Sequence, residues 1–137
     1  EYLDAGYQEI LDEKASLIIR AIQDAGAKAG LVINPDTPVE RLFPHVGHAD
    51  FFLIMSVFAG FGGQKFIPQT YEKISRLKAY MLQRGANTPI EVDGGVSLEN
   101  IHELHKAGAE IFVAGSAIFK SESPVNYISK LRQACID

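Results

Sequence analysis

A unit of amphipathic helix, Gly-Ala stop and short apolar run recurs along this sequence, and it restricts the fold more than any other feature. Gly-Ala pairs stand at 26–27, 85–86 and 108–109, each after apolar residues at helical spacing and before an apolar run. Apolar runs at 29–34, 51–57, 90–92 and 111–114 predict four strands. Strands that alternate with helices form parallel βαβ units, so the sequence predicts an α/β fold.

Local signals place the ends of the predicted helices. Gly26 is typical of a left-handed cap, and Ser123 with Pro124 opens a terminal helix. Thr37 is expected to cap a further helix, with Pro38 in its first turn and Glu40 closing a capping box. The continuous apolar run at 29–34 is of the kind found in strands buried on both faces.

No linker or low-complexity tract divides the chain, so residues 1–137 are expected to form a single domain. Four strands and about five helices fit an open four-stranded parallel sheet, and they also fit half of a (β/α)₈ barrel. The sequence does not decide between these two architectures.

Composition excludes several classes of protein. The net charge is −4 and no block of Lys or Arg occurs, which argues against nucleic-acid binding and a polybasic membrane patch. The longest uncharged run, 51–64, contains three glycines and is shorter than the roughly 18 apolar residues of a membrane helix. A single cysteine, Cys135, and the lack of a signal-peptide pattern favour a reducing, cytoplasmic location.

Glycine-rich loops follow three of the four predicted strands. In parallel α/β folds the functional residues lie in the loops beyond the carboxyl ends of the strands. Here those loops are residues 34–36, 58–64, 93–95 and 115–116. Glycines there let backbone N–H groups approach an anion closely. For 60–64 alone, phosphate binding and a tight turn are equally good interpretations, and no Walker A pattern follows. Gly115 with Ser116 could complete the same site.

Asp93 is the strongest single candidate for a catalytic or metal-binding residue. It directly follows the strand at 90–92, where a carboxylate can bind a metal ion or transfer a proton. Asp-Gly is also a common turn pair, but the position between two glycine-rich loops favours the functional interpretation. Glu91 is interpreted as structural, and Met55 as core or as pocket lining. The histidines are interpreted as surface or packing residues: His45, His48, His102 and His105.

Taken together, five segments resemble the ribulose-phosphate 3-epimerase family. In order along the chain they are GLVINPDTP (30–38), MSV (55–57), GFGGQKF (60–66), EVDGG (91–95) and AGSAIF (114–119). Any one segment alone is weak evidence for the family, but five segments in the same order over most of the chain are strong evidence.

The resemblance implies a ribulose-phosphate-binding (β/α)₈ TIM barrel, of which this chain covers about the last four βα units. Members interconvert D-ribulose 5-phosphate and D-xylulose 5-phosphate, in the pentose phosphate pathway of carbohydrate metabolism. One aspartate removes the C3 proton, a divalent metal ion stabilises the enediolate, and a second aspartate returns a proton from the opposite face. This chemistry needs a fixed positive charge near the oxyanion and one acid/base group on each face.

Carried over residue by residue, Asp93 is implied to be a catalytic aspartate and a ligand of one divalent metal ion. One carboxylate does not select among zinc, iron, manganese and cobalt. Met55 is implied to lie beneath the substrate. The implied substrate and phosphate contacts are Gly60, Phe61, Gly62, Gly63, Gly94, Gly95, Gly115 and Ser116.

The sequence departs from the family pattern in several places. Ala59 stands where the family usually has proline, and residues 1–6 do not match the family's fourth strand. The family's other catalytic aspartate, its metal-binding histidines and its substrate serine come from the first half of the barrel, which no segment matches. We therefore expect this chain to be the C-terminal half of a pentulose-phosphate 3-epimerase. We expect it to be inactive alone and to form part of a homo-oligomer. The alternatives are a ketohexose-phosphate (allulose 6-phosphate) 3-epimerase and a non-catalytic phosphate-binding half-barrel.

Overall fold

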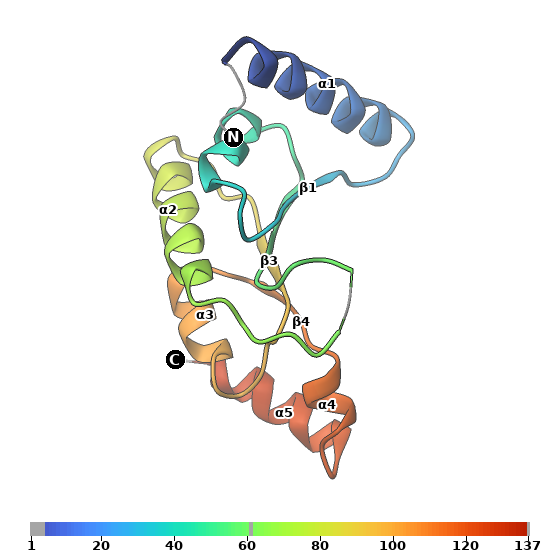
Figure 1. Ribbon diagram of the computed structural model, residues 1–137, viewed down its shortest axis with the longest axis vertical. Helices are drawn as coiled ribbons and strands as arrows, with labels where there is room; N and C mark the ends of the chain where they lie inside the picture. Colours follow the sequence, from blue (N-terminus) through green and yellow to red (C-terminus); the bar gives the residue numbers. More distant parts are fainter. Residues whose placement is uncertain (1–4, 61, 137) are drawn as a thin grey trace.

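Helices and strands alternate along the whole described chain (Figure 1). The computed structural model describes residues 5–60 and 62–136. The elements are α1 (Ala5–Asp24), β1 (Gly30–Ile33), the 3₁₀ helix η1 (Val39–His45), β2 (Phe51–Met55), α2 (Gln69–Gln83), β3 (Ile90–Asp93), α3 (Ile101–Ala107), β4 (Ile111–Val113), α4 (Ser116–Phe119) and α5 (Pro124–Ala134). The four strands lie where the apolar runs predict them, although β2 ends two residues earlier than expected.

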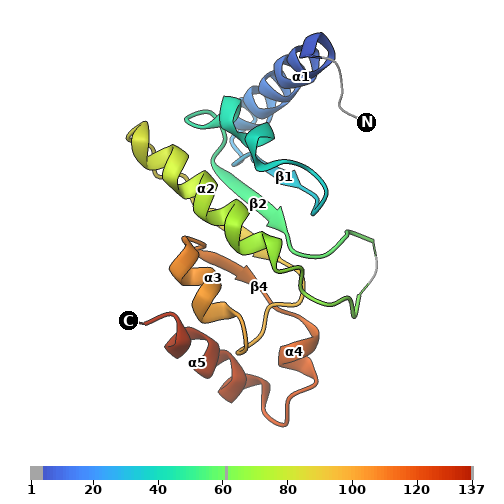
Figure 2. The ribbon, with the colours of Figure 1, turned by 60° about the vertical axis from the view of Figure 1, so that its left-hand side comes forward.

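The four strands form one parallel sheet in the order β1-β2-β3-β4. Each strand therefore pairs with the next one along the chain, and η1, α2, α3 and α5 pack in succession over one face of the sheet (Figure 2). A doubly wound open sheet reverses its strand order and carries helices on both faces. Sequential order with helices on one face is the arrangement of an arc of a (β/α)₈ barrel.

The hydrophobic core lies between the sheet and these helices. Phe52, Ile54, Ile90 and Val92 are fully buried on this covered face, where they belong to one cluster with Ile74, Leu77, Met81 and Leu104 of the helices. The helical spacing of Ile74, Leu77 and Met81, and of Ile101 and Leu104, predicts these helix positions from the sequence.

The opposite face of the sheet is open, so the expectation that the strand at 29–34 is buried on both faces is wrong. Val32 is 58% exposed, Ile111 42% and Val113 39%. Side chains alternate between the two faces of a strand, and no element among the described residues covers the second face. We call this surface, made by Val32, Leu53, Met55, Glu91, Asp93, Ile111 and Val113, the open face.

The predicted capping box at 37–40 is also wrong. The helix there is 3₁₀, it begins at Val39, and Pro38 is its N-cap without a side-chain cap bond. The Arg41 amide binds the Pro38 carbonyl three residues back, and Glu40 pairs instead with Arg76 of α2. Pro44 lacks an amide hydrogen, which disfavours an α-helical pattern in so short a segment.

The helix caps predicted at the two ends of the chain are confirmed. Gly26 has φ 87°, and the Ser123 hydroxyl accepts a hydrogen bond from the Asn126 amide at the start of α5. The helical spacing of Leu11, Ala15, Ile18, Ile22 and Ala25 predicts the apolar side of α1. The structure instead buries Ile19 and leaves Ile18 largely exposed. None of the helices in residues 5–60 and 62–136 has both the length and the apolar composition needed to cross a bilayer.

Asp50 connects the end of α1 with the start of the sheet through hydrogen bonds. Its carboxylate accepts hydrogen bonds from the Ala29 amide (2.7 Å) and from the Gln23 side chain (3.2 Å), while its own amide donates to the Ala29 carbonyl (2.8 Å). The Ala29 amide, then Gln23 and Lys28, lower the pKa of Asp50 below 3.8.

We expect Asp50→Asn to destabilise the chain at neutral pH but not in strong acid. A carboxyl whose folded pKa is depressed contributes stability above its unfolded pKa, and that contribution is lost as the pH falls through the folded pKa. Urea unfolding of both chains between pH 7 and pH 2 should therefore show curves that converge below about pH 4. Glu13→Gln, at an exposed position of α1, is the control; a gap for Asp50→Asn that persists at pH 2 contradicts the prediction.

Candidate active site

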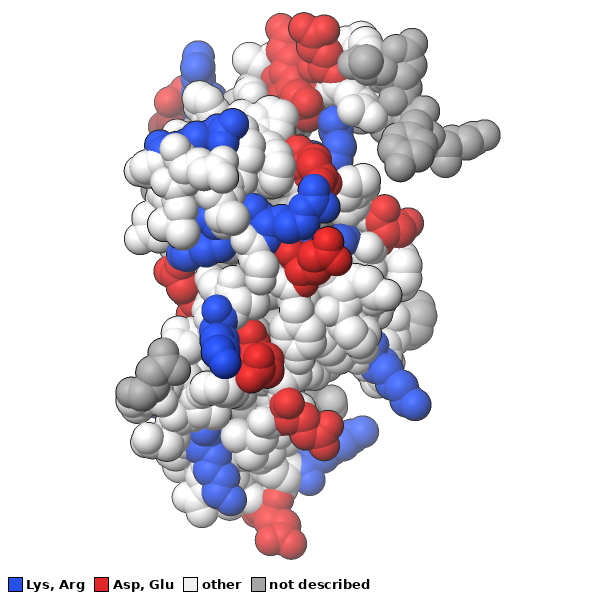
Figure 3. Space-filling view, turned by 90° about the vertical axis from the view of Figure 1, so that its left-hand side faces the viewer, with Lys and Arg blue, Asp and Glu red and all other residues white. Residues whose placement is uncertain are grey.

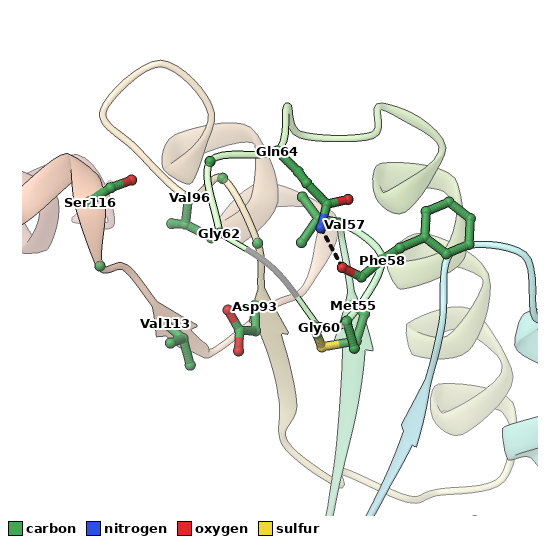
Figure 4. A pocket seen from close by; sticks show the side chains of 15 residues that line it. Met55, Val57, Phe58, Gly60, Gly62, Gln64, Asp93, Val96, Val113 and Ser116 are labelled. Carbon is green, nitrogen blue, oxygen red and sulfur yellow. Dashed lines mark hydrogen bonds between the residues drawn. The ribbon is translucent and has the colours of Figure 1, made fainter.

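One cavity of about 600 Å³ lies at the carboxyl ends of β2, β3 and β4. It brings together every predicted site residue that the structure describes, although these come from three separate loops (Figure 4). They are Met55, Gly60, Gly62, Gly63, Asp93, Gly94, Gly95, Gly115 and Ser116. Phe61 lies outside the described residues.

Asp93 is the last residue of β3 and belongs to the open face. Its neighbours in register are Met55 on β2 and Val113 on β4, and Figure 4 shows the carboxylate between these two side chains. Among the described residues that line the cavity, Asp93 is the one with an ionisable side chain. The cavity therefore combines a single carboxylate with glycine-rich backbone and apolar side chains.

Ser56 connects the loops that form the cavity. Its buried hydroxyl donates to the carbonyls of Asp93 (2.9 Å) and Gly94, and its amide donates to the Asp93 carbonyl (2.9 Å). Its own carbonyl accepts from the Ile67 amide (2.9 Å), beyond the glycine-rich loop. Our sequence reasoning assigned Ser56 no role; its position directly after a strand, next to Met55, was the available signal.

The turn after Asp93 requires glycine at two successive positions. Gly94 has φ 125°, and a Cβ there would lie 2.5 Å from Val57 Cγ2; Gly95 has φ 65°, and its Cβ would lie 3.0 Å from the Phe66 nitrogen. Residues with a side chain rarely adopt such φ angles, and a Cβ has no room at either position. The turn therefore sets the direction in which the chain leaves β3.

Several amides around the cavity have no hydrogen-bond acceptor among the described residues. They belong to Gly62, Gly63 and Gly95. Side chains hold the loops instead: Gln64 donates to the Phe58 carbonyl (2.6 Å), and Asn100 donates to the Gly95 carbonyl (2.8 Å). Amides that are held in place and have no acceptor among the described residues are suited to bind an anion.

The histidines lie away from the cavity, which confirms that they are surface or packing residues. His102 and His105 contact the carbonyls of Ala134 (3.0 Å) and Ala109 (3.2 Å), and His45 is buried with Nε2 3.4 Å from an Asp12 carboxylate oxygen. Within residues 5–60 and 62–136, no three His, Cys, Asp or Glu side chains are grouped to hold a metal ion. Asp93 would supply one ligand of such a site and not a complete shell.

These features define a class of protein. A sequential parallel β/α sheet with helices on one face, and with glycine loops and a carboxylate at the carboxyl ends of its strands, is part of a (β/α)₈ barrel with a site at its mouth. A crystal structure of 3-hexulose-6-phosphate synthase from Salmonella typhimurium has a similar fold, with TM-score 0.58 and 22% identity over 85% of this chain and 53% of that one. At this identity the likeness concerns the fold.

The chain belongs to the ribulose-phosphate 3-epimerase family. Residues 8–119 match the Ribulose-phosphate 3 epimerase family. The chain is 43% identical to the ribulose-phosphate 3-epimerase of Escherichia coli (strain K12) over 120 residues, and 46% identical to that of Serratia marcescens over 107 residues. These matches cover 88% and 78% of this chain but 53% and 51% of the relatives, so the chain spans about half the length of the curated relatives it matches.

We expect Gly94→Ala to lower the free energy of unfolding by about 2 kcal/mol or more, because backbone strain and overpacking each cost about 1–3 kcal/mol. Gly115→Ala is the matched control, since Gly115 has φ −111° and an added Cβ would meet no atom within 4 Å. The control should change stability by about 0.5 kcal/mol at most. Urea unfolding measures both; equal losses would contradict the assigned role of the Gly94 turn.

Proposed function

We propose that this chain supplies the phosphate-binding loops and one acid/base carboxylate of a 3-epimerase that interconverts D-ribulose 5-phosphate and D-xylulose 5-phosphate. The observation that carries the proposal is the cavity in which Asp93 stands beside loops 60–63, 94–95 and 115–116 in a member of this family. The same cavity does not discriminate the five-carbon from the six-carbon sugar phosphate.

The glycine loops would bind the phosphate group through backbone N–H groups. The described lining residues include no Lys or Arg, so the phosphate would be held by amide dipoles and the Ser116 hydroxyl. With the phosphate at these loops, the sugar carbons would extend toward Met55 and Asp93. Fixing the phosphate also holds the reacting carbon at one distance from the carboxylate, which lowers the entropic part of the barrier.

Asp93 would transfer a proton at C3, next to the substrate carbonyl. A carboxylate at the mouth of the site can take this proton from one face of the sugar carbon or give it back. Inversion of C3 needs a second acid/base group on the opposite face, and the described cavity residues include no second one. We therefore infer that the chain alone does not complete the reaction.

A divalent metal ion is part of the proposal, with Asp93 as one of its ligands. Bound there, the ion would supply a positive charge beside the carbonyl oxygen, where negative charge develops when the proton leaves C3. The remaining ligands would come from residues outside the described cavity. A homo-oligomer and a cytoplasmic location stay predictions.

The first test is binding of inorganic phosphate by the 137-residue chain. At constant ionic strength, phosphate should shift the NMR amide signals of Gly62, Gly63 and Gly95 in preference to those of α2, and chloride should not. Asp93→Asn should retain this binding, because the amides and not the carboxylate hold the phosphate. Shifts spread evenly over the surface would contradict a phosphate site in these loops.

The second test separates proton transfer by Asp93 from phosphate binding by the glycine loops. When this chain is completed by the half of the E. coli relative that it does not match, Asp93→Asn should abolish exchange of the C3 proton with D₂O while phosphate binding remains. Asp36→Asn, in the loop after β1 and outside the cavity, should retain exchange. Exchange that survives in Asp93→Asn would remove Asp93 from the proposed chemistry.

The third prediction is that the purified 137-residue chain shows no measurable 3-epimerisation, with or without added divalent metal. The reason is that the described cavity lining holds one acid/base group, Asp93, where inversion needs two. A coupled assay for D-xylulose 5-phosphate measures this, and metal-dependent turnover by the chain alone would overturn the inference. Phosphate binding without exchange even in the completed protein would instead favour a non-catalytic phosphate-binding half-barrel.

A further inference from the structure

Three successive carbonyl groups in the turn after β3 accept hydrogen bonds from buried side chains. The Ser56 hydroxyl donates to the carbonyls of Asp93 (2.9 Å) and Gly94, and the Asn100 side chain donates to that of Gly95 (2.8 Å). Ser56 is 0% exposed and Asn100 is 8% exposed. A buried carbonyl that loses its donor is costly, so these hydrogen bonds fix the rotation of the peptide groups in the turn.

The hydrogen bond to the Gly94 carbonyl also fixes the direction of the next amide. In a trans peptide group the carbonyl and the N–H of the following residue point in opposite directions, and no peptide bond among the described residues is cis. Since the Gly94 carbonyl points at Ser56, the Gly95 N–H points away from Ser56. Gly94 and Gly95 line the cavity, whereas Ser56 lies behind the turn and is not one of the lining residues.

The direction of this amide matters because the cavity has little else that attracts an anion. Its described lining includes no Lys or Arg, and the carboxylate of Asp93 is there. Lys and Arg lie on the helical side of the molecule, where they are intermixed with Asp and Glu (Figure 3). If the Gly94–Gly95 peptide group turned over, it would present a carbonyl oxygen to the anion in place of an N–H, and attraction would become repulsion.

We propose that Ser56 is a positioning residue for anion binding: by holding the Asp93 and Gly94 carbonyls, its hydroxyl turns the Gly95 N–H toward the cavity. The proposal rests on the proposed function in one respect, that the anion is the phosphate group of the substrate. Ser56 does not touch this anion and acts through the Gly94–Gly95 peptide group. A hydroxyl that only stabilised the turn would change unfolding but not the anion affinity of the folded molecule.

The first readout is the direction of the Gly95 N–H, measured as its residual dipolar coupling in the isotope-labelled 137-residue chain. Ser56→Ala should change this coupling, and Ser56→Thr, which keeps the hydroxyl, should leave it as in the unmodified chain. Asn100→Asp is the matched control, because it loses the donor to the Gly95 carbonyl but keeps the oxygen that accepts from the Ser97 amide (3.0 Å). The Gly95 carbonyl belongs to the next peptide group, so this control should change the Gly95 coupling clearly less. An unchanged coupling in Ser56→Ala overturns the proposal.

The second readout is the dissociation constant of inorganic phosphate. Ser56→Ala should raise it at least about tenfold, which is the loss expected for one hydrogen bond to a charged group. Ser56→Thr should bind phosphate nearly as tightly as the unmodified chain. Ile74→Val, which removes a buried methyl group from α2, should lower the urea midpoint without weakening phosphate binding. If Ser56→Ala behaves like Ile74→Val, the hydroxyl is only structural and the proposal is overturned.

The two readouts distinguish failure of this proposal from failure of the proposed function. If the unmodified chain does not bind phosphate at these loops, the proposed function fails, and the dipolar coupling still decides the role of Ser56. If the unmodified chain and Ser56→Ala bind phosphate equally well, the phosphate site stands and the role of Ser56 is overturned. Ser56→Cys, which replaces the hydroxyl with a weak donor, takes the place of Ser56→Ala if circular dichroism shows that the alanine variant does not fold.

Discussion

Burial of Ile90 and Val92 against the helices is the constraint on which the rest of the site depends. Side chains alternate along a strand, so two core residues on one face force Glu91 and Asp93 onto the other. A slip of one residue would bury Asp93 in the core and turn Val92 toward the cavity. The hydrophobic core and the candidate site are thus determined by the same alternation.

The loops at the mouth depend on that placement in turn. Once Asp93 ends β3, its carbonyl and that of Gly94 accept the hydroxyl hydrogen of buried Ser56, which directly follows β2. The turn that this hydrogen bond stabilises requires glycine at positions 94 and 95, because neighbouring atoms occupy the space that a Cβ would need. The stability of this turn and the position of the Gly95 amide, which we propose as an anion donor, therefore depend on the same pair of glycines.

The open face lies beside a cavity whose described lining contains one carboxylate, that of Asp93. One face of each strand is buried among helices, and the other exposes apolar rows around two carboxylates. The family relatives are about twice as long, and a (β/α)₈ barrel places inward side chains from all eight strands around one mouth. The exposed face and the one carboxylate of the described cavity lining are both consistent with a partial barrel.

The sequence by itself determined the parallel α/β class, the four strands, and the grouping of the glycine loops with Asp93 in one candidate site. These follow from local signals: apolar periodicity, Gly-Ala stops and the rule that function lies beyond strand ends. Only the tertiary structure decided that one face of the sheet is open, that Ser56 joins the two strand ends, and that η1 is 3₁₀ without a capping box. These depend on contacts between residues far apart in the chain, 38 residues for Ser56 and Gly94, and no local pattern encodes such a distance.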